Sequence, residues 1–260
     1  MKFSYITYES SEGIATITLN RPAALNALNR EVIAEVLKAL QDVRTDETVR
    51  VVVLTGAGEK AFSAGADIKT MRGMDSLKAR ELSFIGEELC SFLENLGKPV
   101  IAAINGYALG GGLEVAMACD LRIAAETARM GQTEINIGLI PGWGGTQRLT
   151  RLIGMTKAKE LIFTGKMIDA KTAEQLGILN AVVPAGEFRE KVREFAKELA
   201  AKAPVALAVA KALITKGADI GLDSAIALER EGIGVVGSTE DLQEGVTAFA
   251  EKRKPLFKGA

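Results

Sequence analysis

The sequence predicts an α/β fold that ends in a helical region. Short runs rich in β-branched residues alternate with helix-like segments, and this strand–turn–helix order recurs over residues 49–70, 100–118 and 121–152. From residue 187 onward the pattern is almost entirely helical. Ala, Val, Leu and Ile are frequent in these last helices, so we expect the helices to pack against a large apolar surface such as a second subunit.

The first half of the chain holds the strands that we expect to start a sheet. Residues 3–9 and 14–19 alternate apolar and polar side chains on either side of a turn at 11–13, which predicts a β-hairpin. Asn29 is typical of a helix N-cap, and apolar side chains recur on one face of the helix that we expect over 30–43. Two buried strands are expected over 49–54 and 99–104, with a helix between them over 76–96.

The second half becomes increasingly helical. Four glycines and a proline within the eight residues 138–145 cannot form regular structure. Pro204 suits the first turn of a helix and Gly217 suits its end. The other expected elements are strands over 121–125 and 179–183 and helices over 146–165, 169–177, 187–202, 222–236 and 239–252. We therefore expect a core over residues 1–195 and a helical region over residues 196–260.

The composition excludes several classes of partner. Lys and Arg total 32 against 33 Asp and Glu, so no net field attracts nucleic acid or an anionic membrane. No apolar run approaches the roughly 18 residues of a membrane span. The first residues, MKFSYITYESSEG, have no features of a targeting peptide. Cys90 and Cys119 do not form a CxxC pair, so we expect a cytoplasmic protein without a disulfide framework.

The chain contains no histidine. This excludes Ser-His and Cys-His nucleophile pairs, imidazole metal ligands and histidine general bases. The sequence also has no P-loop, and its glycines do not fit the dinucleotide-binding GxGxxG pattern. No Cys/Asp cluster has metal-ligand spacing. If the protein is an enzyme, carboxylates are the first candidates for acid–base chemistry.

The stretch 101–120 is the strongest candidate for a site. A buried-strand run meets the turn Asn105-Gly106, and the glycines 110–112 lead into a helix-like segment that carries Glu114. A helix that begins at these glycines would offer unpaired N–H groups to a developing negative charge, with Glu114 about one turn further on. The same stretch also fits a tight strand-to-helix turn with a solvated Glu114, and the stretch alone does not decide between them.

A second strand-to-helix turn surrounds Gly65, so backbone N–H sites are expected near Ala66 and Gly111. Glu114 and Glu134 are separated by one expected strand, and two successive units could bring both to one end of a layer. Paired carboxylates in an apolar cleft can divide acid and base roles. Either glutamate alone also fits a solvated surface role. Three further charged residues fit a helix cap, a strand-end turn and a surface charge: Asp67, Asp120 and Lys69.

Five segments together resemble the enoyl-CoA hydratase (crotonase) family, over essentially the whole chain. They are residues 61–69, 104–114, 131–134, 140–149 and 248–254. The resemblance implies a spiral of ββα units followed by helices that build trimers or hexamers. It implies an acyl-CoA partner, with coenzyme A as part of the substrate and no separate cofactor. It does not separate a trimer from a hexamer.

The resemblance also implies roles for individual residues. The N–H groups of Ala66 and Gly111 would form an oxyanion hole for the thioester carbonyl. Glu114 and Glu134 match the two catalytic glutamates, and we assign water positioning mainly to Glu114 and proton transfer mainly to Glu134. Gly142 matches a position that orients the site. Positions that match contacts to CoA are Ala24, Leu25, Ala64, Asp67, Ile68, Lys69, Phe249 and Lys252, the last reaching a neighbouring subunit's ligand.

The implied activity is reversible syn addition of water to a 2-trans-enoyl-CoA, as in fatty-acid β-oxidation and butanoate metabolism. Other enzymes of the superfamily usually change one or both acids, whereas both are present here. An isomerase that uses Glu134 alone is the alternative, while a role in RNA binding is disfavoured by the balanced charge. Trp143 departs from the small residue common at its position. Its indole is expected to favour C4 substrates, although it equally fits packing of a glycine loop.

Overall fold

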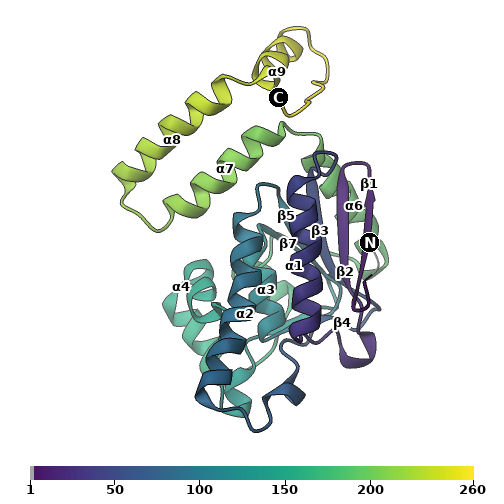
Figure 1. Ribbon diagram of the computed structural model, residues 1–260, viewed down its shortest axis with the longest axis vertical. Coiled ribbons are helices and arrows are strands. Elements are labelled where there is room, and N and C mark those ends of the chain that lie inside the picture. The colour runs from purple at the N-terminus through teal and green to yellow at the C-terminus, as the bar shows by residue number, and fades with distance from the viewer. Residues whose placement is uncertain (1–2) are drawn as a thin grey trace.

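The computed structural model describes residues 3–260, so the first two residues of the expected 1–195 core lie outside it. The molecule has a core of two β-sheets covered by helices, and an arm of three helices that extends from one end of this core (Figure 1). The chain therefore has the α/β architecture with a C-terminal helical region that the sequence predicts.

The larger sheet has the strand order β1-β2-β3-β5-β7-β10. Strands β1 and β2 pair antiparallel, which confirms the predicted hairpin, and all other neighbours in this sheet are parallel. The bounds are β1 Ile6–Ser11, β2 Ile14–Leu19, β3 Val51–Gly56, β5 Val100–Ile104, β7 Leu121–Ala125 and β10 Ala181–Val183. Strands β3, β5 and β7 are buried almost throughout, as expected for a parallel sheet with helices on both faces.

A second, smaller sheet was not predicted from the sequence. Its strand order is β4-β6-β8-β9, with β4 Ala61–Ser63, β6 Tyr107–Leu109, β8 Arg129–Gly131 and β9 Ile168–Asp169. Strands of two or three residues are too short to show a periodic pattern. Along the chain, β4, β6 and β8 each follow a strand of the larger sheet and precede a helix, so the core is a spiral of ββα units.

Helices cover both faces of the larger sheet. The bounds are α1 Arg30–Thr45, α2 Ser76–Asn95, α3 Gly111–Ala118, α4 Gly145–Thr164, α5 Ala170–Gln175 and α6 Phe188–Ala200. Asn29 caps α1 as predicted, because its side chain accepts the Val32 N–H at 3.0 Å. Short 3-10 helices are η1 Pro22–Ala24, η2 Ile68–Met71, η3 Glu134–Ile137 and η4 Ala185–Glu187. The main core lies on the α1–α2 side, and α6 packs on the opposite face.

The arm consists of α7 Pro204–Gly217, α8 Leu222–Gly237 and α9 Glu240–Ala250. Helix α7 has the bounds that Pro204 and Gly217 predict. Helix α6 packs on the sheet through Phe188, Val192 and Ala196, so the expected boundary between residues 195 and 196 falls within a helix of the core. Helices α7 and α8 pack on each other and project from the core (Figure 1).

One buried ammonium group, in the middle of α7, fixes this helix to the core. Lys211 on α7 donates to the carbonyls of Leu93 and Lys98, at 2.8 and 3.1 Å, and to Asp120 Oδ2 at 2.8 Å. Its side chain is 8% exposed. Asp120 lies directly before β7, as the strand-end turn expected from the sequence, and it also accepts the Val100 N–H at the start of β5. It therefore joins α7 to the larger sheet.

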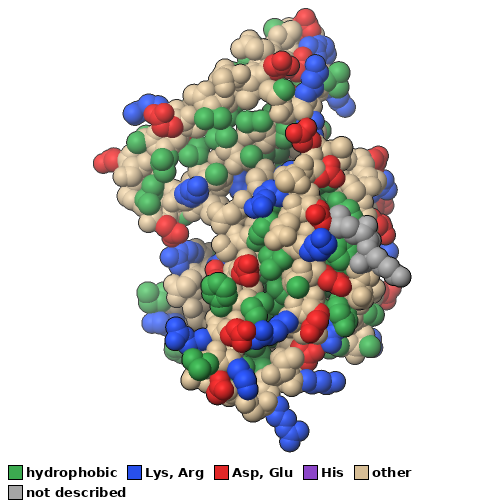
Figure 2. Space-filling model, in the orientation of Figure 1, with side chains coloured by type: hydrophobic (Ala, Val, Ile, Leu, Met, Phe, Trp, Pro, Cys, Tyr) green, Lys and Arg blue, Asp and Glu red, His purple; other side chains and the backbone are tan. Residues whose placement is uncertain are grey.

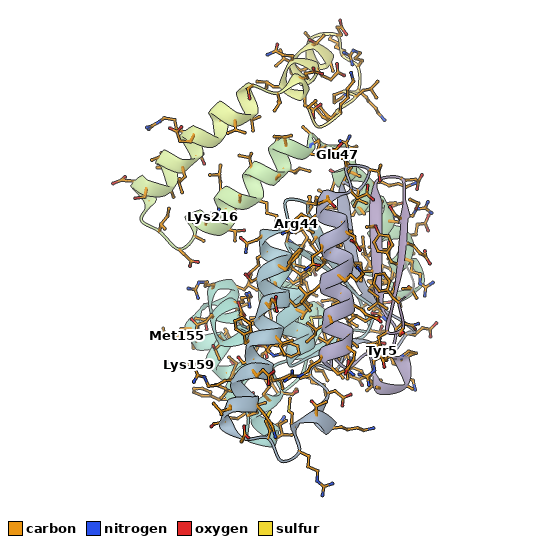
Figure 3. All side chains as sticks on the ribbon, in the orientation of Figure 1. Tyr5, Arg44, Glu47, Met155, Lys159 and Lys216 are labelled. Carbon is orange, nitrogen blue, oxygen red and sulfur yellow. The ribbon has the colours of Figure 1, made fainter. Side chains whose placement is uncertain are left out.

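Much of the arm's apolar surface is uncovered, as the space-filling view shows (Figure 2). Large apolar side chains more than half exposed on these helices include Ile214, Leu222, Ile233 and Phe249. Met155 on α4 is also exposed, and it lies on the same side of the molecule as Lys216 near the far end of α7 (Figure 3). Among the described helices, none combines the length and the apolar character that crossing a membrane requires.

Candidate active site

A cavity of about 360 Å³ opens between α2, α3, η3 and the glycine-rich loop before α4. It contains all five residues that the sequence singles out for catalysis, which are Ala66, Gly111, Glu114, Glu134 and Gly142. These residues come from four separate segments of the chain, and successive ββα units bring them to one place. The rest of the lining is largely apolar, with the side chains of Met71, Met74, Leu82, Ile137, Leu139 and Ile140.

Glu114 lies in the first turn of α3 and is 2% exposed. Its Oε1 accepts two backbone hydrogen bonds, from Trp143 N and Gly145 N, both at 2.7 Å. Burial raises the pKa of Glu114 to about 7, although these two hydrogen bonds act in the opposite direction. The Oε2 atom makes no hydrogen bond to another described residue, so it remains open to a ligand in the cavity.

Glu134 begins η3, three residues after β8 ends. Burial raises its pKa to about 7, and the negative charge of Glu114 acts in the same direction. A Cβ at Gly110 would lie 2.9 Å from Glu134 Oε1, so this glycine leaves room for the carboxylate. Gln132 is buried, and with its amide nitrogen turned toward Glu134 it donates to both carboxylate oxygens at 3.0 and 3.1 Å. Gln132 was not among the site residues predicted from the sequence.

The backbone N–H groups of Ala66 and Gly111 lie on two segments that approach each other closely. Gly65 has φ +92°, and a Cβ there would lie 2.6 Å from Leu109 O and 3.0 Å from Gly111 N. Gly111 is the first residue of α3, where N–H groups have no intrahelical acceptor. Within residues 3–260, neither N–H donates to another protein group, so both are free to bind an anionic oxygen.

Comparisons with known proteins identify the family of this chain. The model of the Enoyl-CoA hydratase/isomerase family matches residues 9–260. The chain belongs to the enoyl-CoA hydratase/isomerase family. It is 46% identical to a short-chain-enoyl-CoA hydratase of Clostridium acetobutylicum, over 98% of this chain and 97% of the relative. It is 42% identical to a crotonyl-CoA hydratase of Syntrophomonas wolfei, over 99% of both chains.

Solved structures of hydratase/isomerase proteins share the fold. The crystal structure of an enoyl-CoA hydratase from Bacillus anthracis has a TM-score of 0.96 and 43% identity, and the match covers 99% of this chain and 100% of that one. A hydratase structure from Geobacillus kaustophilus has a TM-score of 0.95 and 42% identity over 100% of both chains. The spiral of ββα units inferred from the sequence is therefore the crotonase fold.

The segments expected to contact CoA in a hydratase/isomerase protein lie side by side. Ala64 N donates to Leu25 O at 2.9 Å, and Asp67 N donates to Leu28 O at 2.9 Å. Asp67 caps η2, as predicted, by accepting the Lys69 N–H, and it forms an ion pair with Arg21 at 3.1 Å. Ala64 and Ile68 line the cavity, whereas Lys69 is exposed and Ala24 ends η1 beside this segment.

Trp143 is 3% exposed and lines the cavity. Its indole packs between Gly86 of α2 and Gly111 of α3, and Nε1 donates to Leu82 O at 3.1 Å. The residue is therefore part of the cavity wall and also packs against glycines of two helices, while the expected preference for C4 substrates stays a prediction.

Phe249 and Lys252 do not reach the cavity of their own chain. Phe249 is 88% exposed and borders an apolar groove of the arm with Leu242 and Phe257. Helix α9 lies at the opposite end of the molecule from β4, next to which the cavity opens (Figure 1). Neither residue can therefore contact a ligand in the cavity of its own chain, and the CoA contact that the family resemblance implies for them stays a prediction. No group of three or more acidic or cysteine side chains among residues 3–260 is arranged to hold a metal ion.

Proposed function

We propose that this protein is a hydro-lyase that adds water reversibly and syn across the 2,3 double bond of a short-chain 2-trans-enoyl-CoA, to give a 3-hydroxyacyl-CoA. One observation carries the proposal. The buried Glu114 and the half-buried Glu134, each with a pKa raised to about 7, share a cavity with two free backbone N–H groups. The names of the bacterial relatives, a short-chain-enoyl-CoA hydratase and a crotonyl-CoA hydratase, support the same substrate class.

The chemistry follows from the positions of these groups. The thioester carbonyl oxygen accepts the N–H groups of Ala66 and Gly111, which withdraws electrons from the double bond and makes Cβ electrophilic. Glu114 holds a water molecule and takes one of its protons as the oxygen bonds to Cβ. The π electrons move toward the thioester, and the enolate-like state takes a proton at Cα from Glu134. Proton exchange then returns Glu134 to its acid form and Glu114 to its anion.

The environments of the two acids support this division of roles. Two N–H groups donate to Glu114 Oε1, which favours the ionised form that a base requires. Glu134 lies near that negative charge, which favours retention of its proton and opposes the effect of the two hydrogen bonds from Gln132. Because the pKa of each carboxyl group is raised to about 7, the form with Glu114 ionised and Glu134 protonated is accessible at neutral pH. No separate cofactor is required, because coenzyme A is part of the substrate.

Direct measurement of hydration tests the proposal. Loss of the enoyl-thioester absorbance of crotonyl-CoA is followed for the wild type, Glu114→Gln, Glu134→Gln and the exposed control Glu59→Gln. We expect rapid loss for the wild type and the control, and at least about 100-fold lower kcat for both site variants. A wild type that binds acyl-CoA without hydrating it would refute the proposal. Movement of a 3-enoyl double bond that survives Glu114→Gln would instead favour the isomerase.

We extend the proposal to a homotrimer or a pair of trimers in the cytoplasm. The exposed apolar side chains of α7 and α8 suit burial between subunits. Assembly would also bring Phe249 and Lys252 to the CoA of a neighbouring subunit. Both cysteines, Cys90 and Cys119, are buried and unpaired, which suits a reducing compartment. Light scattering tests the assembly, and a monomer at micromolar concentration would refute it.

A further inference from the structure

The orientation of the Glu114 carboxylate depends on hydrogen bonds from the loop at residues 142–145. Side chains outside the cavity hold this loop in place. The N–H groups of Trp143 and Gly145 converge on one carboxylate oxygen, and Gly144 between them has φ +94°. This left-handed residue turns the chain so that both N–H groups face Glu114. The carbonyl of Trp143 accepts from Arg148 Nη1 at 2.6 Å. The Arg148 guanidinium therefore holds the peptide group between Trp143 and Gly144. The N–H groups on either side of this peptide are the two that bind Glu114.

Arg148 is itself held by α2. Its Nε and Nη2 donate to the two oxygens of Glu94 at 2.6 and 2.8 Å, and Nη1 and Nη2 donate to Glu87 at 3.2 and 3.1 Å. A guanidinium has five N–H donors, and with Trp143 O all five are used. The side chain is 14% exposed. Arg148 thus joins the start of α4 and the loop to α2, which forms another wall of the cavity.

We propose that Arg148 is a positioning residue for Glu114, acting through the loop at residues 142–145. It is not among the residues that line the cavity, so it has no direct contact with a substrate bound there. Its role is to keep two N–H groups on Glu114 Oε1 and to leave Oε2 facing the substrate. The expected fall in kcat rests on the proposed function, whereas the expected effect on the hydrogen bonds and pKa of Glu114 does not.

The geometry requires a guanidinium and not simply a positive charge. Lysine has a single ammonium group and cannot serve Glu87, Glu94 and Trp143 O in this arrangement. Arg148→Lys keeps the charge near Glu114 while it releases the loop. We expect kcat to fall about 10- to 100-fold, the range typical of residues that orient a catalytic group, with KM changed less than about twofold. Loss of the two N–H donors disfavours ionised Glu114, so the acid limb of the pH–rate profile moves to higher pH.

The experiment compares Arg148→Lys with Arg151→Lys, an exposed position of the same helix that pairs with Asp219. Glu94→Gln is a second, milder variant that loosens Arg148 without removing it. Melting temperatures show that each variant is folded. A lower kcat with a shifted acid limb in Arg148→Lys and Glu94→Gln, and wild-type behaviour of Arg151→Lys, would support the inference. Unchanged kcat and unchanged pH profile in folded Arg148→Lys would overturn it.

A readout without activity separates this inference from the proposed function. The carboxyl carbon of Glu114 is followed by NMR during a pH titration of the wild type and of Arg148→Lys, with Glu114→Gln used for assignment. The inference requires a higher Glu114 pKa in Arg148→Lys even if the wild type hydrates no crotonyl-CoA. If hydration is observed but the Glu114 titration is the same in both proteins, the proposed function stands and the role of Arg148 is refuted.

Discussion

The indole of Trp143 occupies the volume that a side chain at Gly86 would fill. A Cβ built at Gly86 overlaps the ring atoms Cδ2, Cε2 and Nε1, and one at Gly111 would lie 2.5 Å from Cζ3. The ring is thus held between α2 and α3, and Leu82 O fixes its polar edge. The indole ring forms the cavity wall at this point, and Gly86 and Gly111 leave the space in which it lies.

This arrangement predicts that Gly86→Ala changes the free energy of unfolding in opposite directions with and without the indole of Trp143. Gly86→Ala should destabilise the wild type by about 1–3 kcal/mol, because the added methyl group overpacks the contact with the indole. In a Trp143→Ala background the same change should stabilise by about 0.5–1 kcal/mol, since alanine is the better helix former. Denaturant unfolding of the four proteins in this cycle measures both values. Equal effects in the two backgrounds would contradict the packing.

Removal of the indole should change the preferred acyl length. Trp143→Ala opens the cavity wall, so kcat/KM for octenoyl-CoA relative to crotonyl-CoA should rise about tenfold or more. Trp143→Phe keeps most of the aromatic wall and should give a smaller change. Initial rates with a series of enoyl-CoA chain lengths test this, and an unchanged profile in Trp143→Ala would show that another part of the cavity limits chain length.

A shared proton predicts a narrow pH profile. The pKa values of Glu114 and Glu134 are both raised to about 7, so the form with one proton between them is populated mainly around neutral pH. We expect kcat/KM to fall on both sides, below about pH 6 and above about pH 8. Measurement at constant ionic strength gives the two limbs. A flat profile between about pH 5 and pH 9 would be incompatible with this assignment.

The raised pKa of Glu134 also has a consequence for stability. The native state keeps this proton to about pH 7, whereas the unfolded chain releases it near 4.5, so the residue lowers stability as pH rises through this window. Glutamine cannot ionise. Glu134→Gln should therefore be more stable than the wild type at pH 8 by roughly 1–3 kcal/mol, with a Tm gain of a few degrees that vanishes toward pH 5. Thermal scans at both pH values, with Glu59→Gln as control, measure the difference. A Tm gain of equal size at both pH values would point to a cause other than ionisation.

Local signals in the sequence predicted the long elements well. Pro204 and Gly217 mark the two ends of α7, and Asn29 marks the start of α1, because caps and first-turn prolines act through neighbouring backbone groups. The small sheet was missed for the opposite reason. Strands of two or three residues such as β4 are defined by their partners across the sheet and have no pattern of their own.

The site shows the same limit. Residue patterns led to Glu114, Glu134 and the two glycine turns, and the family resemblance supplied their expected roles. The residues that hold them were not found, because their interactions span the sequence. Arg148 and Glu94 are 54 positions apart, and the contact between Trp143 and Gly86 joins a loop to a helix interior. Ion pairs such as that of Arg148 with Glu94, and close contacts such as that of Trp143 with Gly86, produce no periodic pattern in the sequence.

The ion pair between Lys211 and Asp120 connects the arm to the helix that begins in the cavity. Asp120 follows α3 by two residues, and the other end of α3 is Gly111 in the cavity. An eight-residue helix is about 12 Å long, so one short rod separates the arm from the carbonyl-binding end of the site. In the assembly that we propose, subunit contacts made by the arm would therefore lie one short helix away from the groups that bind the reacting carbonyl.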